Sequence, residues 1–357
     1  MVIQIGTANG SWHKGDSEGA QAFYRLWPFA WLREIDPEIV VVDDMAYGLG
    51  NASRVDWLVL HQPMSATACE IVENAKEIGT RVWVDMDDLI IENHIPPANQ
   101  FAAIFREKAI SESLKTCLSM ADVVSVSTQT LKKALVFYGY APGDKIHVIP
   151  NALPDWAWDK RSPYRKPAPR PLIAWRGSQT HTGDLMLLRE AFTDYPNLDF
   201  LFIGSEPWPL YERYGGKLSK VLLKDWTRGQ AKYFKALKSE KPDYSVVCLE
   251  NVAFNHAKSN ISMLEFMLAG APTIAPAYMP EFNIPGVIQY GNPKAAPGEH
   301  NHDSLAAIFR HIDEGKDIGH REAYQACEEH ISNHLVLSVV NKQRLSLLYA
   351  QPTEANP

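Results

Sequence analysis

The second half of the sequence carries side chains that could hold a diphosphate. Arg176 and Gly177 end an apolar run, and a guanidinium beside a glycine suits phosphates because arginine donates in a fork and glycine admits close backbone approach. Lys258 and Ser259 stand before a helical pattern, where free backbone N–H groups and the ammonium would bind phosphate oxygens. Glu265, two turns further on, could accept hydrogen bonds from ribose hydroxyls. On spacing alone, a surface helix with one acid explains the last three residues equally well.

Three polar residues end apolar runs in the first half of the chain: His61, Asp85 and Asp87. The carboxyl ends of parallel strands face a ligand cleft, so His61 is a candidate sugar contact or proton handler. Either acid could assist an acceptor hydroxyl. Each residue also has an alternative: a structural histidine with satisfied hydrogen bonds, or carboxylates that cap loops or bind a metal as an Asp-x-Asp pair.

Short runs rich in valine and isoleucine alternate with helical stretches along the chain, which is typical of parallel sheets covered on both faces. In the first half the predicted strands are 2–5, 39–42, 57–60, 82–84, 123–126 and 146–149. In the second half they are 172–175, 200–203, 221–223, 245–248, 272–274 and 287–289. A length of 357 residues also exceeds one ordinary core. We therefore predict an α/β protein of two Rossmann-like domains facing across a cleft.

The proline-rich stretch 154–171 separates the two series of strands. Its prolines and charges disfavour both helix and strand, so it predicts an interdomain linker. The expected organisation is an N-terminal Rossmann-like domain over 1–154, a linker over 155–171, a C-terminal Rossmann-like domain over 172–323 and a helix over 324–350. The aromatic stretch 24–32, interrupted by Pro28, predicts a largely buried helix.

The diphosphate-binding stretches lie within longer motifs. The segment 265–275, E-F-M-L-A-G-A-P-T-I-A, resembles the donor-binding block E-A-M-A-x-G-x-P-V-I-A of GT-B glycosyltransferases of family 4. The preceding F-N-x-x-K-S at 254–259 resembles an offshoot of that family from phage and polysaccharide clusters. Two further segments match motifs of the family in the order in which the family has them. Residues 121–131 resemble A-D-x-V-x-V-S-x-x-L, and I-P-N-A at 149–152 resembles V-I-P-N-G. The resemblance covers most of the chain from about residue 80 to 290.

This resemblance implies that 1–154 is the acceptor domain and 172–323 the nucleotide-sugar domain, and it implies roles for particular residues. The groups expected at the donor diphosphate are Arg176, Gly177, Ser178, His181, Lys258 and Ser259. Glu265 would meet the ribose. His181 takes the place of a lysine that serves as the family's second clamp cation, so its charge depends on pH. The family's E-x7-E motif has Ala257 in place of its first acid, and Lys258 with Ser259 would replace that contact.

The family also implies features outside the donor site. The loop 10–19 resembles the glycine-rich acceptor and phosphate loop of this fold, in which Gly15 and Gly19 would let the backbone approach a phosphate. A simple strand-to-helix turn is the alternative, because glycines serve both purposes. In GT-B proteins the last helix returns to the first domain, so 324–350 is expected to pack there. Such proteins need no metal, so none is expected at Asp85 and Asp87.

We therefore predict a glycosyltransferase that moves a sugar from a nucleotide-diphosphate sugar to an acceptor hydroxyl. The family implies retention at the anomeric carbon, no permanently bound cofactor, and a UDP-sugar donor, with a GDP-sugar as the second choice. The acceptor is a saccharide or a hydroxymethylated pyrimidine in DNA. Two alternatives stay open: a nucleotide-sugar epimerase of the same shape, which would act without an acceptor, and a non-catalytic sugar-binding protein.

Charge and composition bear on partners and location. The formal net charge of -7 gives no global attraction to nucleic acid or anionic membrane, so such a partner needs a local patch. The linker has cations that could bind a nucleic-acid backbone, and aromatic side chains beside them on which a base could stack. The cations are Lys160, Arg161, Arg165, Lys166 and Arg170, and the aromatic residues are Trp156, Trp158 and Tyr164. A charged linker is nonetheless usually solvated.

Three features of the sequence predict a cytoplasmic protein without a membrane span. The cysteines are far apart, the start does not resemble a leader, and there is no apolar run of about 18 residues.

Overall fold

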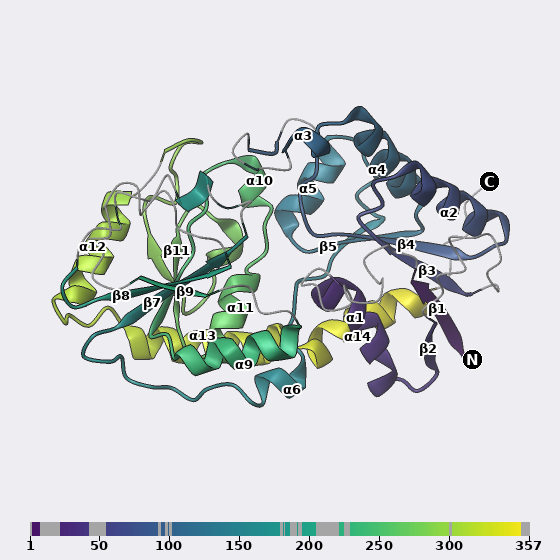
Figure 1. Cartoon of the computed structure of the whole chain (residues 1–357). Helices are drawn as coiled ribbons and strands as arrows, with labels where there is room; N and C mark the ends of the chain where they lie inside the picture. Colours follow the sequence, from purple (N-terminus) through teal and green to yellow (C-terminus); the bar gives the residue numbers. More distant parts are fainter. Residues whose placement is uncertain are drawn as a thin grey trace. The chain divides into compact units, whose positions relative to one another are not determined.

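Two six-stranded sheets, each with parallel neighbours throughout, organise the protein (Figure 1). The computed structural model describes residues 2–7, 22–42, 55–91, 94–96, 99, 102–178, 181, 183–185, 191, 195–204, 221–224, 229–299 and 302–350. By their internal contacts the residues form two units. Unit 1 comprises Met1–Asp87, Glu112–Pro154 and His334–Pro357, and unit 2 comprises Asp88–Ser111 and Asp155–Asn333.

The sheet of unit 1 has the strand order β2-β1-β3-β4-β5-β6. Its strands are β1 (Ile3–Thr7), β2 (Ile39–Val42), β3 (Trp57–His61), β4 (Arg81–Met86), β5 (Val123–Val126) and β6 (Ile146–Val148). Its helices are α1 (Trp27–Ala30), α2 (Ala66–Glu77), α4 (Lys108–Met120, from Glu112 onward), α5 (Gln129–Phe137) and α14 (Leu337–Tyr349). Every residue of β3 is buried, as expected of a parallel strand covered on both faces. One core joins Trp57 and Trp83 of the sheet to Leu337 and Val340 of α14.

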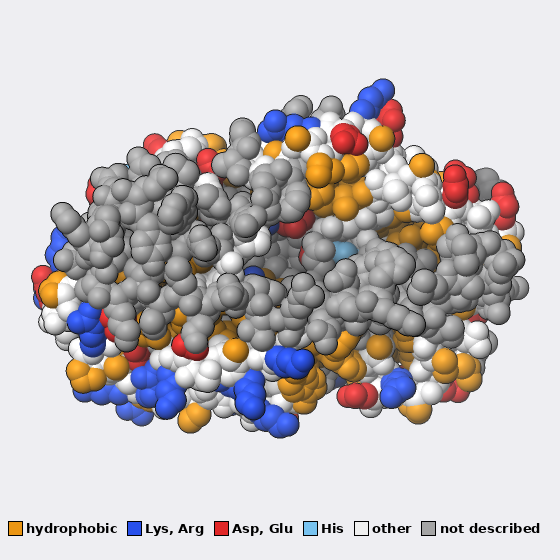
Figure 2. Space-filling view, viewed as in Figure 1, with side chains coloured by type: hydrophobic (Ala, Val, Ile, Leu, Met, Phe, Trp, Pro, Cys, Tyr) orange, Lys and Arg blue, Asp and Glu red, His pale blue; other side chains and the backbone are white. Residues whose placement is uncertain are grey.

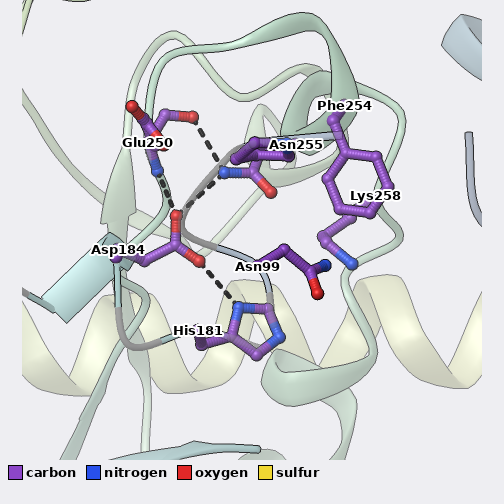
Figure 3. A pocket seen from close by; sticks show the side chains of 9 residues that line it. Asn99, His181, Asp184, Glu250, Phe254, Asn255 and Lys258 are labelled. Carbon is purple, nitrogen blue, oxygen red and sulfur yellow. Dashed lines mark hydrogen bonds and ion pairs between the residues drawn. The ribbon is translucent and has the colours of Figure 1, made fainter. Parts of the chain in front are cut away.

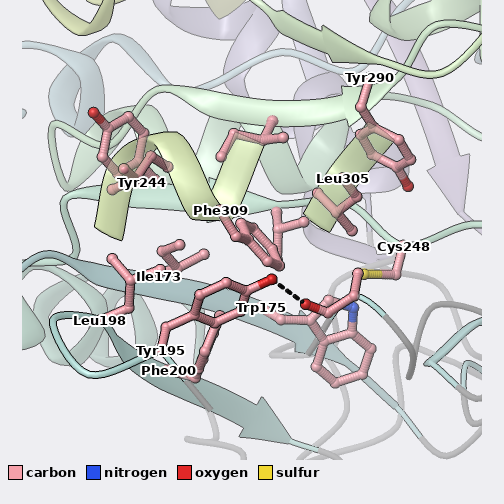
Figure 4. Close-up of a cluster of buried hydrophobic side chains, with 14 of the residues drawn as sticks. Ile173, Trp175, Tyr195, Leu198, Phe200, Tyr244, Cys248, Tyr290, Leu305 and Phe309 are labelled. Carbon is pink, nitrogen blue, oxygen red and sulfur yellow. Dashed lines mark hydrogen bonds between the residues drawn. The ribbon is translucent and has the colours of Figure 1, made fainter. Parts of the chain in front are cut away.

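The sheet of unit 2 has the order β12-β11-β10-β7-β8-β9. Its strands are β7 (Leu172–Gly177), β8 (Asp199–Gly204), β9 (Val221–Lys224), β10 (Tyr244–Val246), β11 (Thr273–Pro276) and β12 (Ile288–Tyr290). Its helices are α3 (Ala102–Phe105), α6 (Asp155–Trp158), α9 (Gln230–Glu240), α10 (Ala253–His256), α11 (Ile261–Leu268), α12 (His302–Asp313) and α13 (His320–His334). Aromatic rings fill its core (Figure 4), where Phe309 of α12 lies 5.5 Å from Phe200 and 6.0 Å from Tyr195 between ring centroids.

The predicted fold class, two parallel α/β sheets, is confirmed, and each predicted apolar run overlaps a strand. The aromatic stretch forms a π-helical segment Ala22–Leu26, then α1 and a 3-10 turn Trp31–Glu34. Pro28, which has no N–H to donate, lies in the first turn of α1, directly after the π-helical segment. Within the described part of the chain, no helix is both long and apolar enough to cross a membrane.

The single helix expected over 324–350 is two helices, α13 and α14. Val336 between them is extended, with φ -94 and ψ 150, and forms a parallel bridge with Leu153. Leu153 donates from its N–H to Leu335 O at 2.9 Å, and the Leu337 N–H donates to Leu153 O at 2.8 Å. The helix therefore breaks because a distant part of the chain takes the backbone groups at this point.

The stretch 155–171, expected to lack regular structure, begins with the short helix α6 and belongs to unit 2. Arg161 pairs with Glu328 of α13, and Arg165 pairs with Asp243 at the start of β10. The same stretch passes close to Gly270, just after the end of α11. Gly270 has φ +80, and a Cβ on it would lie 3.3 Å from Pro163 O. The stretch is thus packed along unit 2 by specific contacts.

Candidate functional site

A row of polar side chains crosses the carboxyl ends of β3, β4 and β5 in unit 1. His61, Asp85 and Ser125 are register partners on these neighbouring strands, so their side chains share one face of the sheet. His61 Nδ1 lies 3.0 Å from Asp85 Oδ2, and the Ser125 hydroxyl donates to Asp85 Oδ1. Strands that are otherwise apolar therefore bring three buried polar groups into contact.

Arg25 of the π-helical segment completes the shell around Asp85. Its Nε and Nη2 donate to Asp85 Oδ2 and Oδ1 at 2.8 and 2.6 Å. Its Nη1 donates to Ile149 O at 2.8 Å and Asn151 Oδ1 at 3.1 Å, so the I-P-N-A motif helps to hold the guanidinium. Burial alone would raise the pKa of Asp85, but Arg25 and His61 outweigh burial and hold it below its usual range. Asp85 is a fixed anion whose oxygens are occupied.

Asp87 is the more accessible acid of this cluster, with 16% of its side chain exposed against 1% for Asp85. His61 Nε2 lies 3.4 Å from Asp87 Oδ1, and the Gln62 amide donates to the same oxygen. Burial would lower the pKa of His61, but Asp87 and Asp85 raise it to about 9. At neutral pH His61 is therefore an imidazolium, which can donate a proton but not accept one.

Gln62 was not predicted to belong to this cluster. Its φ of 47 lies in the left-handed region, which costs a non-glycine residue about 1–2 kcal/mol. The Gln62 N–H donates to Asp85 O at 2.9 Å, which holds this conformation and turns the amide toward Asp87. Strained residues of this kind concentrate at functional sites.

The polar groups of unit 2 gather where the order of its strands reverses along the chain. From β7 the chain moves through β8 and β9 to one edge and then returns to place β10 on the other side of β7. In open parallel sheets, ligands bind beside the carboxyl ends of the strands at such a switch point. Arg176 and Gly177 end β7 here, followed by Ser178 and His181.

A pocket at this switch point is lined by residues that follow β7 and β10, together with Pro96 and Asn99 (Figure 3). Asp184 is its central acceptor: His181 Nδ1 lies 2.7 Å from Oδ2, while Asn255 Nδ2 and the Glu250 N–H donate to Oδ1 at 2.9 and 2.7 Å. Asp184 and Asn255 are buried, at 6% and 2% exposure, whereas His181 keeps 22% of its side chain exposed. Asp184 thereby fixes the orientation of the imidazole at the pocket.

Lys258 lines the same pocket from the segment between α10 and α11. Its ammonium donates to Asp88 Oδ1 at 3.0 Å and lies 4.5 Å from the centroid of the Phe254 ring. The predicted F-N-x-x-K-S element thus supplies three pocket residues, Phe254, Asn255 and Lys258. The ammonium adds a positive charge to a lining that also holds the imidazole of His181, amide groups, and the carboxyl groups of Asp184 and Glu250.

Glu265 of α11 is fully buried and meets three donors. Arg176 Nε lies 2.8 Å from Oε2, Gln230 Nε2 donates to Oε1 at 3.0 Å, and the Tyr233 hydroxyl donates to Oε2 at 3.2 Å. Burial and the Glu265 carboxylate raise the pKa of Tyr233, so its hydroxyl stays a donor. The predicted phosphate and ribose residues, Arg176 and Glu265, therefore meet each other directly.

The remaining predicted residues fall in different places. Gly177 leaves no room for a side chain, because a Cβ would lie 2.5 Å from the Trp175 ring. Ser178 is exposed and Ser259 half-buried. Gly15 and Gly19 lie outside the described residues. Among the described residues, no three His, Cys, Asp or Glu side chains are placed to hold a metal ion.

Sequence reasoning missed the residues that hold the predicted ones in place: Arg25, Gln62, Asp184, Gln230 and Tyr233. None of them belongs to a motif of the resemblance. Arg25 precedes its partner Asp85 by 60 residues, and Gln230 precedes Glu265 by 35, so no local spacing could have paired them. Only Asp184, three residues after His181, offered a local signal, since residues at that spacing share a helix face.

No protein-family model and no curated protein matches the chain. Among solved structures, Anabaena Alr3699/HepE in complex with UDP and glucose is 13% identical, with a TM-score of 0.63 over 97% of this chain and 99% of that one. An alpha-glucosyltransferase in complex with UDP-glucose and DNA containing an abasic site is 13% identical, with a TM-score of 0.61 over 98% and 100%. A UDP-N-acetylglucosamine 2-epimerase is 10% identical, with a TM-score of 0.53 over 100% and 99%. These likenesses show the fold: the chain has the two Rossmann-like sheets of GT-B proteins.

Proposed function

We propose that the protein is a glycosyltransferase that takes its sugar from a UDP-sugar. The observation that carries the proposal is the pocket at the β7 and β10 switch point, with Lys258 and His181 in its lining and Arg176 at the end of β7. The Lys258 ammonium and the Arg176 guanidinium suit a nucleotide diphosphate. Structures of the same fold hold UDP, UDP-glucose or a sugar, which favours UDP over GDP.

The donor diphosphate binds to Arg176, Lys258 and His181. When the bond to the sugar breaks, negative charge grows on the diphosphate, and fixed cations stabilise that charge without rearranging. Glu265 holds Arg176 by its ion pair, so the guanidinium is oriented before the donor arrives. The resemblance to family 4 supports retention at the anomeric carbon.

In unit 1 the acceptor hydroxyl is assigned to the neighbourhood of His61 and Asp87. Asp87 is ionised because the His61 imidazolium, despite the opposing effect of burial, lowers its pKa, so it can accept a hydrogen bond from a hydroxyl. Asp85 supports His61 and has no oxygen to spare for substrate. The acceptor is a saccharide or a hydroxymethylated pyrimidine in DNA, and a DNA-bound glucosyltransferase shares the fold.

The test is calorimetric binding of UDP-glucose and other UDP- and GDP-sugars, followed by assays for hydrolysis and transfer. We expect a UDP-sugar to bind and Arg176→Ala to weaken binding at least tenfold. The matched control is Arg310→Ala, which removes an exposed arginine of α12 in the same unit. Failure of every donor to bind, or equal binding by both variants, would overturn the proposal.

The epimerase likeness defines a second outcome of the same assays. A transferase leaves UDP-N-acetylglucosamine unchanged at C2, whereas an epimerase inverts that centre without an acceptor. Proton NMR of the nucleotide sugar after incubation with protein alone separates the two. An inverted C2 centre would replace the transferase with the epimerase function.

A further inference from the structure

Helix α9 in unit 2 carries lysines at regular spacing. Tyr233, Phe234 and Leu237 bury the inner side of the helix, while Lys232 and Lys235 are exposed on the outer side. Lysine recurs at every third position from residue 232 to 241. At a rise of about 1.5 Å per residue, this row extends over roughly 13 Å. Each step of three residues turns about 60° short of a full turn, so the lysines wrap around the exposed side of α9 as far as Lys241, which follows its last turn.

The stretch 159–170 adds to this row because it lies beside α9. Lys238 Nζ donates to Lys160 O at 2.9 Å, and Arg165 Nη2 donates to Lys241 O at 2.7 Å. Lys160 and Lys166 are themselves exposed. We call these six residues the lysine strip: Lys160, Lys166, Lys232, Lys235, Lys238 and Lys241. Lys and Arg side chains are visible along the lower edge of Figure 2, below the region where Figure 1 draws α9 and α6.

The lysine strip differs from the nucleic-acid grip that the sequence predicts for the linker. Arg161, Arg165 and Arg170 are paired within unit 2, to Glu328, Asp243 and Asp199 at 2.8, 2.6 and 2.7 Å. Trp158 is 4% exposed, and Tyr164 packs against the rings of His320 and Tyr324. In contrast, no ion pair between described residues involves a lysine of the strip. The charge available to a partner thus sits on α9 as much as on the linker.

The chemistry of the strip favours one kind of partner. Six cations on α9 and on the stretch beside it exceed what a single diphosphate can engage, and duplex DNA offers about one negative charge per 1.7 Å of its axis. A bilayer is a poorer fit, because an interfacial helix needs an exposed apolar face and that of α9 is buried. The three arginines of the linker, whose forks could read base edges, are paired within unit 2, so contacts would be to phosphates and independent of sequence.

We propose that the lysine strip is a docking surface for the backbone of duplex DNA, which brings the polymer that carries the acceptor to this protein. The acceptor role rests on the proposed function, whereas the docking itself does not need the donor. The net charge of -7 makes the rest of the chain repel DNA on average, so binding depends on this local surface.

The experiment measures binding of a fluorescent duplex of about 20 base pairs by anisotropy over a range of salt concentrations. With six phosphate contacts, the plot of log affinity against log salt should have a slope of about -5, and affinity should fall about a thousandfold between ~50 and ~200 mM. The triple variant Lys232→Gln, Lys235→Gln, Lys241→Gln should flatten the slope by about 3. The corresponding Lys→Arg variant keeps the charge and should restore the slope.

The matched control removes three exposed lysines of unit 1 by Lys115→Gln, Lys133→Gln and Lys342→Gln, and its slope should equal that of the wild type. No DNA binding at low salt, equal losses in both glutamine variants, or binding only to phosphatidylserine vesicles would overturn the docking surface. UDP-glucose binding should survive in the strip variant. A protein that binds DNA but no nucleotide sugar would instead overturn the proposed function and leave the docking surface standing.

Discussion

At the scale of single residues, buried carboxylates hold cations in place in both units. Asp85 is surrounded by Arg25, His61 and Ser125. Glu265 is surrounded by Arg176, Gln230 and Tyr233. A buried charge is costly unless it is paired and hydrogen-bonded, and both acids satisfy that condition. Each therefore acts through the group that it orients.

A substitution of Glu265 can distinguish two roles for this residue: orienting Arg176, or contacting the ribose as the sequence implied. Glu265→Gln keeps the shape of the side chain but removes the charge that orients Arg176. We expect affinity to fall about tenfold or more for both UDP and inorganic pyrophosphate, because the diphosphate contact is what is lost. A ribose contact predicts a different result: weaker UDP binding with pyrophosphate binding unchanged. Calorimetry with both ligands decides, and Glu322→Gln on the exposed side of α13 is the control.

His61 makes the stability of unit 1 depend on pH. Its pKa is raised from 6.5 to about 9, so its ion pairs stabilise the fold fully below about pH 6.5 and are lost as pH rises through 9. The difference in unfolding free energy between wild type and His61→Gln should therefore shrink from up to about 3 kcal/mol at pH 6 toward zero above pH 9. Urea unfolding across this range measures it. A constant difference would contradict the ion pairs, and exposed His311→Gln serves as control.

At the scale of elements, the strands could be predicted because each is a short apolar run buried on both faces. Trp57–His61 shows this most simply, since all five residues are buried. The break between α13 and α14 could not be predicted, because Val336 is extended only through its pairing with Leu153, 183 residues earlier. The same applies to the site: motifs identified Arg176 and Glu265 separately, while their contact depends on how β7 and α11 pack.

The turn before β12 shows how closely elements approach in unit 2. Gly286 has φ +85, and a Cβ there would lie 2.4 Å from Ala323 O and from Cys327 N of α13. Gly286→Ala should cost about 3 kcal/mol or more, because backbone strain and a backbone clash add. Gly298→Ala has a similar φ of +84 with nothing within 4 Å, so only strain of about 1–2 kcal/mol is expected. Urea unfolding of both variants compares them, and equal losses would contradict the close approach.

At the scale of the whole molecule, unit 1 is assembled from segments far apart in the sequence. Leu337, Val340 and Leu348 of α14 are buried in the same core as Ile5 and Trp83. Unit 2, by contrast, takes nearly all of its residues from one continuous segment, Asp155–Asn333. The integrity of the first sheet therefore depends on a helix encoded some 190 residues after its last strand.

Removing α14 should separate the stabilities of the two units. In a chain cut after residue 333, unit 1 loses five buried apolar side chains, each worth about 1.5–3 kcal/mol: Leu335, Val336, Leu337, Val340 and Leu348. The core of unit 2 keeps its residues. Hydrogen exchange should show β1 to β6 unprotected and β7 to β12 still protected. Loss of protection in both sheets, or in neither, would contradict this division, and a chain cut after residue 350 is the control.

The shared core of β1 to β6 and α14 also sets an order of events on the ribosome. The first sheet emerges early, yet Leu348 follows Val148 by 200 residues. At roughly 5–20 residues per second, the sheet waits about 10 to 40 seconds for its last core element. During that interval unit 2 emerges whole and can complete its own core first. The half of the protein that is made first is thus the half that finishes folding last, and its apolar strands are the ones that nascent-chain chaperones would meet.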